Sequence, residues 1–257
     1  MNALELYKKL PKKNCGECRQ KKCMPFALSL IKGEAELSEC PYLTEDAVNE
    51  LKKAIVHSDW REDLILRLRE EIKDIDFSEA ASRMGAELKD RALILKCMGR
   101  EFMIDPGGEV TTKGFITPWM KILLLHYIKT GGRADWSGKW VSFSELKSGM
   151  VKASSFTRDC EEPLREMLDR DFQKVTQLLS RFGAEARNDF QTKLAWHILL
   201  LPKIPVVTLY WPADIEFDSK VKVLFDSTAD KFLDVESIIF LVEGLVYNIE
   251  AALSRPA

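Results

Sequence analysis

Four of the six cysteines lie within the first forty residues, at a spacing that is typical of metal ligands. The spacing is C-x2-C-x4-C-x16-C-P, and the residues are Cys15, Cys18, Cys23 and Cys40, followed by Pro41. Thiolates are soft ligands, and in a reducing compartment a cysteine cluster is more typical of a metal centre than of disulfides. We therefore predict that these four cysteines bind one metal centre.

The spacing also indicates which metal centre the cysteines hold. With no histidine in the set, the two candidates are zinc and an iron–sulfur cluster. Structural zinc sites usually have two C-x2-C knuckles, and Cys23 and Cys40 do not form the second one. A proline directly after the last cysteine also recurs in iron–sulfur ligand runs. The pattern favours an iron–sulfur cluster, with structural zinc as the alternative.

Two local elements must position these ligands, a tight turn and a short helix. Gly16 permits the turn between the first two cysteines, because glycine adopts backbone angles that other residues avoid. After Cys23, Pro25 lies early in a predicted helix that Gly33 ends. The apolar face of this helix consists of Phe26, Ala27, Leu30 and Ile31. The fourth ligand then follows the helix.

The chain divides into a small cysteine-rich part and a larger remainder. The first 43 residues are too few to bury a sufficient core, and a bound metal centre can supply the missing stability. Thr44 is a candidate N-cap for a connecting helix over residues 44–57. We place the boundary at 56–59 and predict a cluster module with its connecting helix over 1–57 and a second domain over 58–257.

The second domain has both helical and strand patterns. Apolar residues recur at helical spacing over 59–73 and 161–182, and Thr117 and Asp234 are candidate N-caps of two further helices. Strand patterns cover 91–97, 101–104, 194–201, 205–210 and 220–225. Helices and strands in this mixed order predict an α+β domain behind the iron–sulfur module.

The cysteine segment resembles a known iron–sulfur domain. The matching residues are Asn14 to Cys18, Cys23, Phe26 and Ala27, Gly33, and Cys40 to Leu43. They are similar to the [4Fe-4S] domain of the corrinoid iron–sulfur protein large subunit, a family of anaerobic acetyl-CoA synthesis and cleavage. The resemblance implies one [4Fe-4S] cluster on the four cysteines, which passes single electrons to a corrinoid cobalt.

The resemblance ends near residue 43. The rest of the chain is too short for the corrinoid-binding TIM barrel that follows in that family, and it lacks an Asp-x-His-x-x-Gly motif for the cobalt. The resemblance thus supports the cluster more strongly than a bound corrinoid. A corrinoid protein remains the redox partner that it suggests.

The remainder resembles a second family, from anaerobes, which is described as a domain of unknown function and often has this cluster domain in front. The matching segments are 140–146, 201–205, 210–214 and 224–230. This resemblance implies an anaerobic cytoplasmic setting, and it implies no activity.

Charge and hydropathy restrict the partners. The formal net charge is −2, so no overall field attracts nucleic acid, and we predict no nucleic-acid partner. The first residues lack the apolar run of a secretory signal, and the longest apolar runs are too short to cross a bilayer. We therefore expect a cytoplasmic protein without membrane association.

Seven cations surround the first three cysteines: Lys8, Lys9, Lys12, Lys13, Arg19, Lys21 and Lys22. Nearby positive charge stabilises the reduced, more negative state of an iron–sulfur cluster and raises its potential. The same cations could bind an acidic redox partner. An ordinary solvated surface is the alternative.

The other residues with chemical potential are isolated in the sequence. His57, His126 and His197 stand alone, and the last two lie in apolar segments, which favours structural roles. Cys97 is interpreted as a buried small residue and Cys160 as a residue at a helix start. The acidic segments 211–214 and 226–230 are interpreted as turns, with the rim of a ligand pocket as the alternative.

The sequence leaves three functions open. The first is one-electron transfer in anaerobic metabolism through a [4Fe-4S] cluster, to or from a corrinoid protein or cofactor. The second is a non-catalytic binding or regulatory protein whose cluster is structural or senses oxygen. The third is an enzyme with a substrate pocket in the second domain. No catalytic residue can be assigned, so whether the protein is an enzyme stays open.

Overall fold

The computed structural model describes residues 3–31, 33–55 and 60–254. The chain forms two compact units, Met1–Leu66 and Arg67–Ala257. The predicted boundary between residues 57 and 58 falls in the segment 56–59, which lies outside the described residues, and so does His57.

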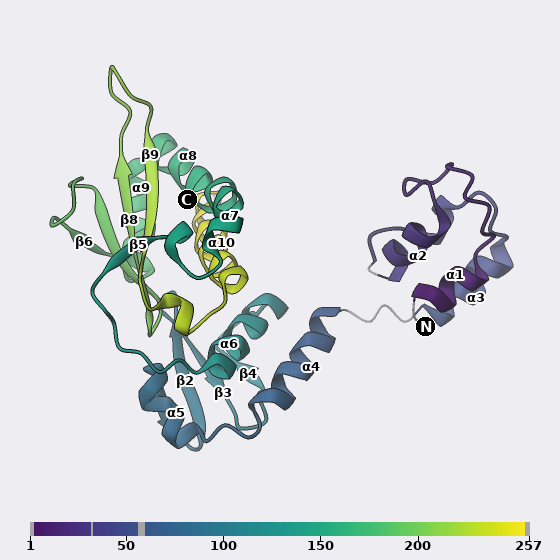
Figure 1. Cartoon of the computed structure of the whole chain (residues 1–257), viewed down its shortest axis with the longest axis horizontal. Coiled ribbons are helices and arrows are strands. Elements are labelled where there is room, and N and C mark those ends of the chain that lie inside the picture. Colours follow the sequence, from purple (N-terminus) through teal and green to yellow (C-terminus); the bar gives the residue numbers. More distant parts are fainter. Residues whose placement is uncertain (1–2, 32, 56–59, 255–257) are drawn as a thin grey trace. The chain divides into compact units, whose positions relative to one another are not determined.

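The first unit is helical (Figure 1). It contains α1 (Ala3–Lys9), α2 (Cys23–Ile31) and α3 (Glu45–Ala54), and α4 (Trp60–Ile72) begins in it. The buried side chains of Leu6, Phe26, Leu30 and Leu51 belong to one apolar cluster. The Thr44 hydroxyl accepts a hydrogen bond from the Ala47 N–H at 3.3 Å, which confirms Thr44 as the N-cap of α3.

The second unit contains a small antiparallel sheet of four strands in chain order. The strands are β1 (Glu87–Lys89), β2 (Ala92–Cys97), β3 (Arg100–Ile104) and β4 (Val110–Thr111), and α5 (Phe77–Met84) precedes them. Met98 and Gly99 join β2 to β3 with φ angles of 50° and 74°. Two consecutive positive φ angles are typical of a tight hairpin turn, which here joins strands that match the strand patterns over 91–97 and 101–104.

The second sheet has five antiparallel strands in the order β5-β9-β8-β7-β6. The strands are β5 (Trp140–Ser142), β6 (Glu185–Arg187), β7 (Ala195–Leu201), β8 (Ile204–Trp211) and β9 (Lys220–Asp226). The central strand, β8, is buried along all but its last residue. Its continuous apolar run is therefore explained by its position between β7 and β9.

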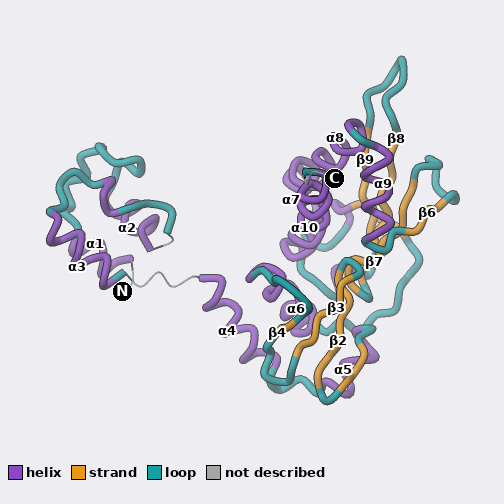
Figure 2. Tube along the Cα trace, turned by 180° about the vertical axis from the view of Figure 1, so that it is seen from behind, coloured by secondary structure: helices purple, strands orange, loops and turns teal. Residues whose placement is uncertain are grey.

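Further helices of the second unit are α6 (Pro118–Thr130), α7 (Gly149–Phe156), α8 (Glu162–Arg170), α9 (Phe172–Arg181) and α10 (Val235–Leu253). The last helix contacts the four others. Figures 1 and 2 show α7, α8 and α10 together on one side of the larger sheet. Helices and antiparallel sheets in one chain confirm the α+β fold class. No helix in the described part of the chain combines the length and apolar character of a membrane span.

The prediction of a single helix over 161–182 is wrong, because the helix is interrupted at Asp171, between α8 and α9. Asp171 has φ −151° and ψ 75°, and its side chain accepts a hydrogen bond from the Lys174 N–H at 3.0 Å. Aspartate competes for backbone N–H groups and so favours a cap over a helix interior. Cys160 is not at a helix start either, since it lies within a π-helical turn, Thr157–Glu161, that joins α7 to α8.

Candidate metal centre

The four predicted ligands all lie in the first unit, on three local elements. Cys15 and Cys18 lie in the loop between α1 and α2, Cys23 is the first residue of α2, and Cys40 follows the 3-10 turn Leu37–Glu39. All four are free of disulfides. Cys15 is exposed, Cys18 and Cys40 are half-buried, and Cys23 is buried.

Three of the cysteines meet at one apolar cluster. Cys23 is part of the buried cluster of the first unit, and Cys18 and Cys40 pack against it. Cys15 is not part of this apolar core, and it lies near Tyr42. The pKa of Tyr42 is raised, first by its hydrogen bond to Glu17 and by the Glu17 charge, and further by the nearby charges of Cys15 and Cys40.

Within the residues that the structure describes, no three His, Cys, Asp or Glu side chains are grouped closely enough to hold a metal ion. The four cysteines therefore share one small unit without forming a closed ligand set. Their predicted role as ligands rests on the donor chemistry and on their spacing in the sequence, and three of them, Cys18, Cys23 and Cys40, contact the same apolar core.

The loop that carries Cys15 and Cys18 turns repeatedly. Lys12, Asn14, Gly16 and Lys21 all have positive φ angles, between 48° and 81°. The Asn14 side-chain oxygen accepts a hydrogen bond from the Cys23 N–H at 2.8 Å, which connects the loop to the start of α2. Gly16 has φ 81° and open space around its Cβ position, so glycine is needed there for backbone angle and not for room.

The cations near this loop differ in how they are paired. Lys9 forms an ion pair with Glu50 at 3.3 Å, and Arg19 donates to the backbone carbonyl of Glu34. The Lys13 ammonium lies 3.8 Å from the centre of the Tyr42 ring, where a cation is attracted to the aromatic face. Lys21 and Lys22 are exposed. The loop surface is therefore positively charged beside the cysteines.

The two described histidines lie in the second unit, in different settings. His126 is on α6, with its Nδ1 atom 3.8 Å from a carboxylate oxygen of Asp234. His197 is on β7, with its ring edge-on to Trp136 and Trp140. Burial lowers the pKa of both side chains. Partly buried rings with neighbours of this kind agree with the structural roles expected from the sequence.

The two acidic segments of the second unit start at strand ends: Trp211 is the last residue of β8 and Asp226 the last of β9, and the predicted turn is present after Asp226. Asp226 is buried and accepts hydrogen bonds from Ser137, Gly138 and Thr228, between 2.7 and 3.1 Å. Asp214 accepts from the N–H groups of Glu216 and Phe217, both at 2.8 Å. These carboxylates are therefore engaged by the loops that contain or approach them.

Two family models match the chain. The model described as "Putative Fe-S cluster" matches residues 10–42, the segment that contains all four clustered cysteines. The model described as "Domain of unknown function (DUF3786)" matches residues 76–248. No solved structure gives a significant match.

Several curated relatives match part of the chain. The corrinoid/iron-sulfur protein large subunit of Moorella thermoacetica is 48% identical over 54 residues, which are 21% of this chain and 12% of that protein. Subunit gamma of the acetyl-CoA decarbonylase/synthase complex of Methanothermobacter thermautotrophicus is 25% identical over 134 residues, 51% of this chain and 26% of that protein. The corresponding subunit of Methanopyrus kandleri is 38% identical over 55 residues, 21% of this chain and 12% of that protein.

The chain thus spans an eighth to a quarter of the length of these relatives. Together with the family model over 10–42, the relatives support an iron–sulfur cofactor in the first unit.

Proposed function

This chain belongs to the DUF3786 family of domains of unknown function, and it has an iron–sulfur segment in front of that domain. We propose that this N-terminal segment makes the protein a one-electron carrier. One [4Fe-4S] cluster is held by Cys15, Cys18, Cys23 and Cys40. The observation that carries the proposal is the set of four free cysteines inside the segment that matches the iron–sulfur model.

The surroundings of the cysteines fit such a cluster. Soft thiolates are its usual ligands, and when bound it supplies a one-electron couple. The apolar core around Cys23 shields one side of the iron–sulfur cluster from water. The exposed Cys15 leaves the other side of the iron–sulfur cluster accessible to a partner. Asn14 and Tyr42 hold the ligand loop through their hydrogen bonds to Cys23 and Glu17.

The proposed partner is an acidic redox protein in anaerobic cytoplasmic metabolism. Exposed Lys12, Lys13, Lys21 and Lys22 provide the positive surface that such a protein would contact. The names of the relatives, a corrinoid/iron-sulfur protein and acetyl-CoA decarbonylase/synthase subunits, support a corrinoid protein as the candidate.

Metal analysis of anaerobically purified protein tests the cluster. We expect about four iron and four sulfide per chain, with visible absorption and, after reduction, an EPR signal. Serine at any of the four clustered cysteines should impair assembly, whereas the matched controls Cys97→Ser and Cys160→Ser should retain the iron. Stoichiometric zinc without iron, even after reconstitution, would refute the assignment.

Redox titration distinguishes electron transfer from a structural or oxygen-sensing cluster. A carrier should be reduced and reoxidised repeatedly with its fold and iron content intact. A cluster that shows no reversible reduction, and whose removal unfolds the first unit, would favour the structural role instead.

A further inference from the structure

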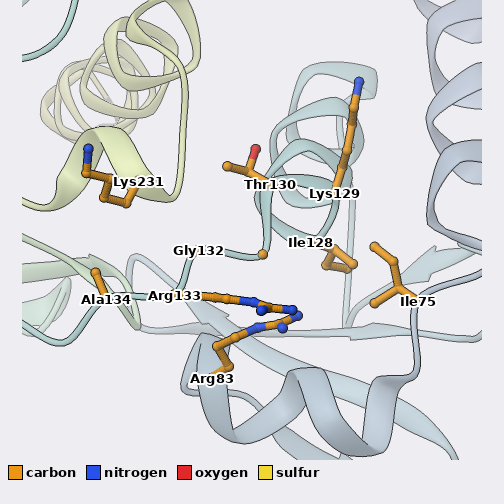
Figure 3. A pocket seen from close by; sticks show the side chains of 10 residues that line it. Ile75, Arg83, Ile128, Lys129, Thr130, Gly132, Arg133, Ala134 and Lys231 are labelled. Carbon is orange, nitrogen blue, oxygen red and sulfur yellow. The ribbon is translucent and has the colours of Figure 1, made fainter.

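A pocket of about 480 Å³ in the second unit is lined by cations and has no acidic residue in its lining (Figure 3). The cations come from three separate parts of the chain: Arg83, Lys129 and Arg133, and Lys231. Arg83 lies in α5, and Lys129 lies in the last turn of α6. The fold therefore brings four positive charges to one small surface cavity.

Two of these charges are compensated by neighbours. Lys129 forms an ion pair with Glu71 at 2.6 Å, and the Lys231 ammonium lies 3.7 Å from a carboxylate oxygen of Asp230. Lys129 also lies where a cation interacts favourably with the carboxyl end of a helix. The two lysines thus have structural explanations.

The two arginines of the pocket, Arg83 and Arg133, have no such compensating neighbour within the part of the chain that the structure describes. Neither Arg83 nor Arg133 takes part in an ion pair or side-chain hydrogen bond there, and the Nε–H of Arg83 is buried without a partner. Figure 3 shows both guanidinium groups directed toward the same part of the pocket, below Gly132. Like charges repel, and a buried N–H without an acceptor is unfavourable.

From this geometry we propose that the pocket binds a phosphate group. An oxyanion there would accept a hydrogen bond from the unsatisfied Nε–H of Arg83, and its negative charge would compensate both guanidinium charges. Planar guanidinium groups bind phosphate in a bidentate manner, and the several oxygens of a phosphate can serve two such groups at once. The two oxygens of a carboxylate would serve two guanidinium groups less well. The chemical class of ligand is therefore inorganic phosphate or a phosphoryl compound.

The backbone of the pocket is shaped for close approach. Gly131 ends α6 with φ 52°, and a Cβ there would lie 3.3 Å from an Nη atom of Arg83. A Cβ on Gly132 would lie 2.5 Å from the Lys231 carbonyl and 2.6 Å from the Phe232 ring. These two glycines let the chain pass between Arg83 and Lys231 before it reaches Arg133. The positions of the two arginines thus depend on a constrained turn.

Calorimetric titration of the full-length protein with inorganic phosphate tests the site. We expect saturable one-site binding at constant ionic strength in a chloride buffer. Arg133→Gln changes an exposed residue, so it should fold normally and weaken binding at least tenfold. Arg83→Lys keeps the charge but loses the Nε–H and the planar fork, and it should weaken binding to a similar extent. Arg170→Gln, at an exposed arginine of α8 outside the pocket, is the matched control and should bind like the unchanged protein.

Further ligands identify the source of the phosphate group. Acetate should bind at least tenfold more weakly than phosphate, whereas methyl phosphate represents a phosphate monoester. Tighter binding of methyl phosphate than of phosphate would identify an organic phosphoryl compound, and the reverse would identify the free anion. Absence of saturable binding, or equal affinity in Arg133→Gln, Arg83→Lys and Arg170→Gln, would overturn the proposal.

The site does not depend on the proposed electron carrier. The same titration on Cys15→Ser protein should give an unchanged affinity, because the pocket lies entirely within the second unit. A failure of the cluster assignment would leave this result unaffected, and a failure of phosphate binding would leave the iron content unaffected.

Discussion

Cys97 and Cys160 are buried in the second unit, and burial raises the pKa of both thiols, for Cys97 to about 12. A thiol with a raised pKa has little of the reactive thiolate at neutral pH. Their chemistry therefore differs from that of exposed Cys15, which has the most accessible sulfur of the clustered cysteines. Burial separates the two isolated cysteines from the candidate ligands.

We predict that iodoacetamide modifies Cys15 of the metal-free protein first, because Cys15 is the exposed one of the four clustered cysteines. Cys97 and Cys160 should remain unmodified until the protein is unfolded by denaturant. Peptide mass spectrometry over time measures each rate. Modification of Cys97 or Cys160 as fast as that of Cys15 in the folded protein would contradict their burial.

Asn14 allows a prediction about cluster retention. Its side-chain oxygen accepts a hydrogen bond from the Cys23 N–H at 2.8 Å. Its φ angle of 48° is one that asparagine tolerates better than most residues. Asn14→Ala removes the acceptor and should cost about 1 kcal/mol of local stability, so chelators should remove iron faster. Asn14→Asp keeps an acceptor and serves as the control. Absorbance during chelation measures both rates, and equal rates would show that this hydrogen bond does not hold the loop.

At the scale of elements, Asp226 connects the end of β9 to the loop before β5. Burial alone would raise the pKa of this carboxyl, but hydrogen bonds from Thr228, Ser137 and Gly138 outweigh it, so the pKa is lowered. A carboxyl with a lowered folded pKa stabilises the fold above its unfolded pKa, and this stability is lost as the pH falls through the folded value.

We predict that Asp226→Asn lowers the free energy of unfolding by about 1–3 kcal/mol at neutral pH, because several donors lose a charged acceptor. The difference from the unchanged protein should shrink as the pH falls below about 4, near the unfolded pKa of aspartate. Urea unfolding across a pH series measures it. Asp218→Asn, at an exposed position, is the control, and a pH-independent difference would exclude the carboxylate as its cause.

Local patterns predicted the elements whose signals are contained in neighbouring residues. Thr44, Thr117 and Asp234 all cap their helices through a side-chain oxygen, as expected from their positions. The short strands β1, β5 and β6 were not predicted, because three residues carry too little periodicity and form a strand only by pairing with a neighbour. The break at Asp171 was missed because apolar spacing continues across it on α8 and α9.

At the scale of the whole molecule, the proposed electron transfer depends on the charged surface of the first unit. Screening acts within about 8 Å at physiological salt, so a reaction steered by exposed lysines should slow as ionic strength rises. A candidate partner is first isolated by anaerobic pull-down, and a corrinoid protein is the one expected.

We predict that reversing Lys12, Lys13, Lys21 and Lys22 to glutamate slows electron transfer to that partner about tenfold or more, with iron content and spectra unchanged. Stopped-flow kinetics at several salt concentrations measures the rate. The matched control reverses four exposed lysines of the second unit, Lys89, Lys113, Lys139 and Lys147, which gives the same net charge. A rate that responds equally to both sets would show that the position of the lysines is unimportant.

Taken alone, the sequence determined the iron–sulfur segment, the α+β class and most of the longer elements. These depend on the types and spacing of residues that are close in the chain, which act through local hydrogen bonds, periodic burial and ligand chemistry. Only the tertiary structure decided which side chains share a surface. Arg83 and Arg133 have no common motif, and they converge because α5 and the turn after α6 meet in space. Charge compensation acts through space, so their lack of partners emerges only from the folded chain.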